Sequence, residues 1–136
     1  MNSLEIDTLF TNVKNYNGCI AKENLKQIKE GCTVLNLSEK GTHWTALYKR
    51  NNNTYYFDSF GCMPPLIVFK LEPHTQWSKV QYQKIRASNC GAFASYFLTT
   101  CNSSSVNTIL GFMNKPSPLF VNKIDTFLID WLLSVQ

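Results

Sequence analysis

The sequence predicts a single α+β domain that spans residues 1–136, with a small central sheet and flanking helices. The chain has 136 residues, which is enough for one hydrophobic core and too few for two domains. Hydrophobic residues make up 44% of it and charged residues only 16%, a balance that favours a folded core over disorder. The predicted elements run from helices through a group of strands to further helices, without the repeated βαβ units of a parallel fold.

Two helices are expected at the start of the chain. Residues 3–14 carry apolar side chains at helical spacing, and Ser3 is the candidate N-cap. Residues 21–30 suggest a second short helix that ends at Gly31.

Three strands are expected next. Residues 33–37 form a short apolar run typical of a strand. Residues 43–49 and 54–58 are two more hydrophobic runs, and the charged, asparagine-rich stretch 49–53 between them predicts the polar tip of a hairpin.

The second half of the chain is expected to return to helices. A turn at 61–65 leads into 66–78, an ambiguous stretch that suggests a short helix followed by a loop around Pro73, and then into a candidate strand at 79–84. Apolar periodicity predicts three later helices, at 90–101, 104–113 and 118–135.

The cysteines and the N-terminus suggest a reducing compartment. The number of cysteines is odd and the first residues lack the features of a secretory signal, so reduced thiols in the cytosol or nucleus are expected. The sequence contains no CxxC pair, so a structural zinc site is not expected. No apolar run has the length of a membrane span. The net charge of +4 permits an acidic partner or nucleic acid without requiring either.

Cys90 is the candidate nucleophile. It precedes Gly91 at the predicted start of a helix, where unpaired backbone N–H groups favour the thiolate. The thiolate is the nucleophilic form of cysteine, and Gly91 would let a substrate backbone approach closely. A buried structural cysteine at a helix start is the alternative interpretation.

His43 and Asp58 are the candidates for the other half of a catalytic triad. They occupy the outer ends of the two hairpin strands, so the hairpin alone brings an acid near a histidine. The histidine would accept the thiol proton and later protonate a leaving amine, while the acid orients it. Two polar strand-end residues that face solvent are the alternative.

Two further residues are candidates around this triad. Trp44 is either a core residue or a wall beside the imidazole. Gln83 stands seven residues before Cys90 and would donate its amide to the oxyanion together with the backbone N–H of Cys90, with Gln76 and Gln81 as competitors.

The segments "GTHWTALY", "YYFDSFG" and "YQKIRASNCGAFASYFL", in this order, resemble the adenain family of viral cysteine proteases, part of a group that includes the SUMO-specific proteases. His43, Asp58, Gln83 and Cys90 fall on the family's catalytic pattern, and the seven-residue spacing from glutamine to cysteine looks like the adenovirus branch. The SUMO-protease branch would have an aspartate where this chain has Asn89.

The resemblance implies a papain-like, adenain-like fold and a thiol endopeptidase. It would cleave after glycine in viral capsid or core precursor proteins during virion maturation, in the infected cell's cytoplasm or nucleus and in the virion. A monomer that needs no metal or membrane is expected. Related enzymes suggest an activating peptide or DNA, with Cys101 as a candidate attachment thiol. A deubiquitinase or deSUMOylase of the same fold and a non-catalytic binding module are the alternatives.

Overall fold

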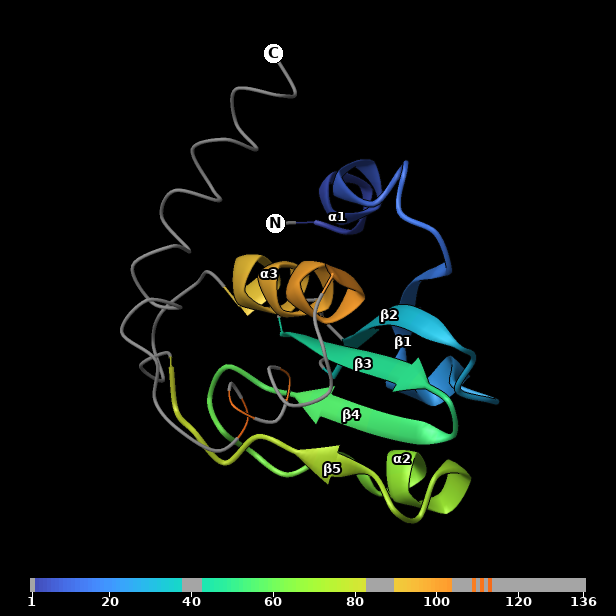
Figure 1. Ribbon diagram of the computed structural model, residues 1–136, viewed down its shortest axis with the longest axis vertical. Helices are drawn as coiled ribbons and strands as arrows, with labels where there is room; N and C mark the ends of the chain where they lie inside the picture. Colours follow the sequence, from blue (N-terminus) through green and yellow to red (C-terminus); the bar gives the residue numbers. More distant parts are fainter. Residues whose placement is uncertain are drawn as a thin grey trace.

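Five strands form one sheet with the spatial order β1-β2-β3-β4-β5 in the computed structural model, which describes residues 2–37, 43–82, 90–103, 109, 111 and 113 (Figure 1). The inner pairs β2–β3 and β3–β4 are antiparallel, whereas β1 and β5 pair in parallel with their neighbours. The strands are β1 (Tyr16–Ala21), β2 (Gly31–Asn36), β3 (Trp44–Arg50), β4 (Asn53–Phe57) and β5 (Gln76–Trp77).

Helices cover both faces of this sheet, which confirms the predicted α+β class with a small central sheet. Helix α3 (Cys90–Ser103) lies across β3 on the same side as α1 (Ser3–Leu9), and α2 (Leu66–Leu71) lies near β5 (Figure 1). A single turn of 3-10 helix, η1 (Lys22–Asn24), comes directly after β1.

Strand alternation divides the buried side chains into two clusters, one on each face of the sheet. The larger cluster joins α1 and α3 to the sheet and includes Ile6, Phe10, Val34, Trp44, Ala46, Tyr48, Tyr55, Phe57, Phe93, Phe97 and Leu98. The smaller cluster on the opposite face consists of Leu25, Ile28, Leu35, Leu47, Tyr56 and Val68.

The hairpin is confirmed, with a tighter connection than the sequence suggested. Arg50 pairs with Asn53, so only Asn51 and Asn52 lie between the strands. Both have positive φ angles, 52° and 69°, which are the values of a type I′ turn and are tolerated well by asparagine. This turn fixes the register of β3 and β4, which places the start of β3 beside the end of β4.

The predictions for the first 30 residues need correction. Helix α1 is shorter than expected, and its N-cap is Asn2, whose side chain forms a capping box with Glu5. The predicted helix at 21–30 is wrong: β1 ends at Ala21, and the segment between η1 and β2 is irregular. Leu25 and Ile28 have helical spacing, yet they bury their side chains beneath the sheet from this irregular segment.

The later elements are partly as predicted. The short helix and the helix that starts at Cys90 are present, but residues 79–82 form no strand. The backbone N–H of Tyr82 instead donates to the carbonyl oxygen of Ser59, at 2.9 Å, so this segment runs beside the turn after β4. The helices predicted at 104–113 and 118–135 fall outside the described residues, apart from Ile109, Gly111 and Met113. None of the described helices is long and apolar enough to span a membrane.

Candidate active site

His43 immediately precedes β3 and is held there by the neighbouring strand. Its carbonyl oxygen accepts a hydrogen bond from the backbone N–H of Leu37, at 3.0 Å, which extends the β2–β3 ladder by one step. The adjacent pair in this ladder is Asn36 with Trp44. The backbone of His43 is therefore fixed by the sheet rather than by a free loop.

Asp58 comes immediately after β4 and begins a tight turn. One carboxylate oxygen, Oδ1, accepts from the backbone N–H of Phe60 at 2.8 Å, and its carbonyl oxygen accepts from the N–H of Gly61 at 2.8 Å. Aspartate at the first position and glycine at the fourth are typical of such turns. Gly61 has a φ angle of +74°, which glycine adopts at little cost.

The imidazole of His43 is hydrogen-bonded to the carboxylate of Asp58, with 3.1 Å between Nε2 and Oδ1. Ala46 pairs with Phe57, so continuing this antiparallel register places Phe60 opposite His43. The Phe60 ring indeed stacks on the imidazole, with centroids 4.7 Å apart and planes 17° from parallel. Phe60 thus contacts His43 through its ring and Asp58 through its backbone.

Cys90 is the first residue of α3, and its thiol contacts the imidazole of His43. Its Sγ accepts from the backbone N–H of Trp44 at 3.4 Å, and the thiol is also hydrogen-bonded to His43. Asp58 contacts Nε2, which leaves Nδ1 as the ring nitrogen able to serve Cys90. Thiol, imidazole and carboxylate are therefore connected in series.

These contacts shift the pKa values of the thiol and the imidazole in opposite directions. Burial raises the pKa of the Cys90 thiol, but hydrogen bonds from His43 and from the Trp44 N–H outweigh it, and the pKa falls below its ordinary value. Burial lowers the pKa of His43, but its hydrogen bonds to Asp58 and Cys90 raise it to about 9. Both shifts favour a thiolate–imidazolium pair at neutral pH.

Solvent access differs along this series. Asp58 is only 1% exposed and Cys90 5% exposed, whereas the His43 side chain retains 19% of its surface. A buried carboxylate with a fixed partner holds its geometry well, and a partly open imidazole is able to exchange a proton with a bound molecule.

The other four cysteines lie in different environments. Burial raises the pKa of Cys19 and Cys32 to about 11 and that of Cys101 well above its ordinary value. Cys62 is exposed, and its pKa is also raised. None of the five cysteines forms a disulfide, and Cys101 is only 1% exposed.

Cys90 is therefore expected to be the most reactive thiol at mildly acidic pH. At pH 6, limiting iodoacetamide should label Cys90 at least about tenfold faster than Cys62, because a thiolate reacts and a protonated thiol does not. Peptide mapping by mass spectrometry measures the ratio. The preference should disappear in His43→Ala, and preferential labelling of Cys62 in the wild-type protein would contradict the assignment.

The remaining predicted site residues have different outcomes. Trp44 is 6% exposed and its side chain belongs to the larger core cluster, while its backbone N–H contacts Cys90. Gly91 is the second residue of α3, and its backbone N–H contributes to the lowered pKa of Cys90. Gln83 lies outside the described residues. Within the described part of the chain, no group of three or more His, Cys, Asp or Glu side chains is arranged to hold a metal ion.

Phe60 is the site residue that sequence reasoning missed. Residue 60 lies opposite residue 43 because the hairpin turn has two residues, whereas the sequence had predicted a longer tip at 49–53. The backbone N–H of Trp44 was missed as well. Its contact with Cys90 joins residues 46 positions apart and depends on how α3 packs across β3, which no local pattern reveals.

Comparison with known proteins gives little beyond this geometry. No family model matches the chain, and no curated protein matches it significantly. Among solved structures, the pS273R protease of ASFV is similar at a TM-score of 0.45 and 19% sequence identity, over 71% of this chain. The chain spans 42% of the length of that protease. The case for chemistry in this protein therefore rests on Cys90, His43 and Asp58 themselves.

Proposed function

We propose that this protein is a cysteine endopeptidase that cleaves after small residues, above all glycine, in viral precursor proteins during virion maturation. The observation that carries the proposal is the serial hydrogen bonding of Cys90, His43 and Asp58. The adenain-like sequence segments support the viral substrate class, with capsid and core precursors as substrates in the infected cell and virion.

The chemistry begins with the thiolate of Cys90. Its sulfur attacks the scissile carbonyl carbon, and the carbonyl electron pair moves to oxygen to form a tetrahedral oxyanion. Collapse of this intermediate expels the amine, which takes a proton from the imidazolium of His43 and leaves a thioester on Cys90. Neutral His43 then takes a proton from water, and the resulting hydroxide hydrolyses the thioester and restores the thiolate–imidazolium pair.

Three other groups assist in this scheme. Asp58 holds the imidazole at one nitrogen and stabilises its positive charge. Phe60 covers one face of the same ring, which limits rotation of the imidazole and keeps water from that face. Gln83 is proposed, with the backbone N–H of Cys90, as the donor to the oxyanion.

The decisive experiment is digestion of a peptide library in which the residue before the scissile bond varies. Cleavage should be efficient after glycine and weak after any residue larger than alanine, and it should vanish in Cys90→Ala. Fusions of ubiquitin and SUMO are digested in parallel. Cleavage of only the folded fusions would replace the proposal by a deconjugating protease, and no cleavage of any substrate would favour a binding module.

A further inference from the structure

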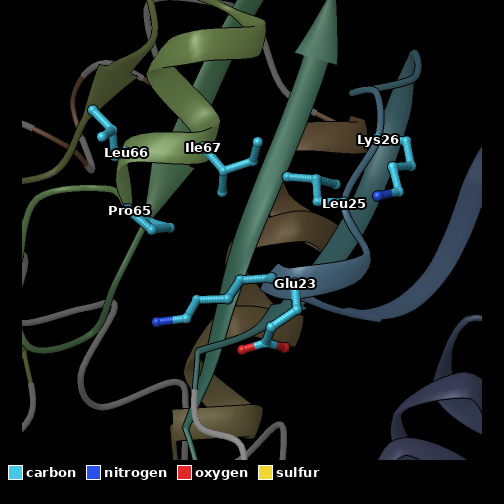
Figure 2. A pocket seen from close by; sticks show the side chains of 7 residues that line it. Glu23, Leu25, Lys26, Pro65, Leu66 and Ile67 are labelled. Atoms are coloured by element: carbon cyan, nitrogen blue, oxygen red, sulfur yellow. The ribbon is translucent and has the colours of Figure 1, made fainter.

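A pocket of about 380 Å³ opens on the face of the sheet opposite to α3. This volume is within the range of sites that bind small molecules or individual side chains, roughly 300–1,000 Å³. Figure 2 shows Leu25 on one side of the pocket and Pro65, Leu66 and Ile67 from the start of α2 on the other. Lys22, Glu23 and Lys26 complete the lining.

The pocket lies at the same end of the sheet as the candidate active site. Ala21, which immediately precedes the η1 wall, pairs with Asn36, and Asn36 pairs with Trp44, whose N–H contacts Cys90. The opposite wall begins at Pro65, four residues after the turn that holds Asp58. The first wall therefore follows a strand that is joined through β2 to β3, and a short connection joins the second wall to the Asp58 turn.

The lining has an apolar floor and a basic rim. Leu25 is buried, whereas Leu66 is 68% exposed at the mouth, and Met63 close by in the sequence is 62% exposed. Leu66 therefore offers a partner an apolar surface at the mouth of the pocket. Among the described residues, ion pairs join His43 to Asp58 and Lys49 to Glu72, so Lys22 and Lys26 remain available to a partner.

We propose that this pocket docks a segment of the substrate polypeptide, away from the scissile bond, that carries a leucine-like side chain flanked by carboxylates. The aliphatic side chain enters between Leu25 and Ile67, and the carboxylates pair with Lys22 and Lys26. Two lysines against the single Glu23 give the rim a net positive charge, which favours an acidic flank. The assignment of this segment to the substrate rests on the proposed function, whereas its chemistry rests on the lining alone.

The probe for this proposal is a fluorescein-labelled peptide, Glu-Asp-Leu-Leu-Asp-Glu, which contains no glycine. Its binding to the wild-type protein is measured by fluorescence anisotropy and does not depend on catalysis. Leu66→Ser should weaken binding by about tenfold, the effect of one lost aliphatic contact. Lys22→Glu should weaken it by about fivefold, and added salt should weaken wild-type binding as well.

Matched controls are available at exposed positions outside the pocket. Leu4→Ser removes a leucine that is 74% exposed, and Lys14→Glu makes the same charge change before β1, at the other end of that strand. Both should bind the probe as the wild type does. Equal weakening by pocket and control variants, or no binding at millimolar probe, would overturn the proposal.

Activity then connects the pocket to the substrate. Adding the same acidic leucine segment to a cleavable glycine peptide should lower KM by about fivefold with kcat unchanged, and Leu66→Ser should abolish that gain. If the probe binds but no peptide is cleaved, the pocket is a site for acidic leucine segments and the proposed protease function is wrong. A dimer seen by sedimentation velocity that Leu66→Ser dissociates would assign this face to a second copy and overturn the substrate proposal.

Discussion

Replacing His43 with alanine is expected to lower kcat/KM by about 10⁴-fold or more while the protein stays folded. His43 performs two tasks in the proposed mechanism, since it keeps Cys90 ionised and protonates the leaving amine. Its side chain belongs to neither of the two core clusters, so its loss leaves the packing of both clusters in place. Steady-state kinetics on a glycine peptide measure the effect, and circular dichroism shows that the fold is retained.

The Asp58→Asn variant tests the orienting role of Asp58 separately from proton transfer by His43. The asparagine amide oxygen is still able to accept from His43 and from the Phe60 N–H, while the negative charge is lost and the second oxygen is replaced by an NH2 donor. Activity should fall less than in His43→Ala and remain measurable, because Asp58 orients the imidazole and does not itself transfer the proton. Losing the carboxylate also removes a group that raises the pKa of His43.

The pH dependence of activity in this variant is expected to shift in a defined direction. The imidazolium is required, so wild-type activity should fall as pH rises through the His43 pKa, which is about 9. The alkaline limb in Asp58→Asn should therefore move to lower pH. Full activity of Asp58→Asn with an unchanged profile would reject Asp58 as a member of the triad.

The candidate site was predictable because most of it is local in sequence. A hairpin with a two-residue turn determines which residues lie opposite each other, so His43 and Asp58 meet without help from distant segments. Cys90 was recognisable because a helix start favours a thiolate. Its distance from His43, in contrast, depends on α3 packing across β3, and only the resemblance to known proteases suggested that these groups meet.

The missed strand β1 and the wrongly predicted helix at 21–30 have a common physical cause. Strand β1 pairs in parallel with β2 and carries Gly18 with a φ angle of +94° beside an irregularity in the pairing, so neither alternation nor turn residues reveal it. Residues 21–30 have helical spacing, but burial of Leu25 and Ile28 against the sheet overrides that local preference. Tertiary contacts from distant strands decide both cases.

A second large effect is expected from Gly61→Ala, which should destabilise the protein by about 2–4 kcal/mol. The φ angle of +74° disfavours alanine. An added Cβ would also lie 3.0 Å from the carbonyl oxygen of Lys79 and 3.1 Å from the backbone nitrogen of Gln81. These are backbone atoms, so the 79–82 segment or the turn that holds Asp58 must shift.

Gly18→Ala is the matched control for this variant. Gly18 has an even larger positive φ, +94°, but an added Cβ there meets no atom within 4 Å. Gly18→Ala should lower the free energy of unfolding, measured by urea denaturation, only by the penalty for a positive φ, about 1–2 kcal/mol. Because the Gly61 turn fixes Asp58 and contacts the segment that leads toward Gln83, Gly61→Ala should also lower kcat by roughly 10- to 100-fold, while Gly18→Ala leaves kcat unchanged. Equal stability losses, or equal kcat values, would show that close packing between this turn and residues 79–81 does not support the active site.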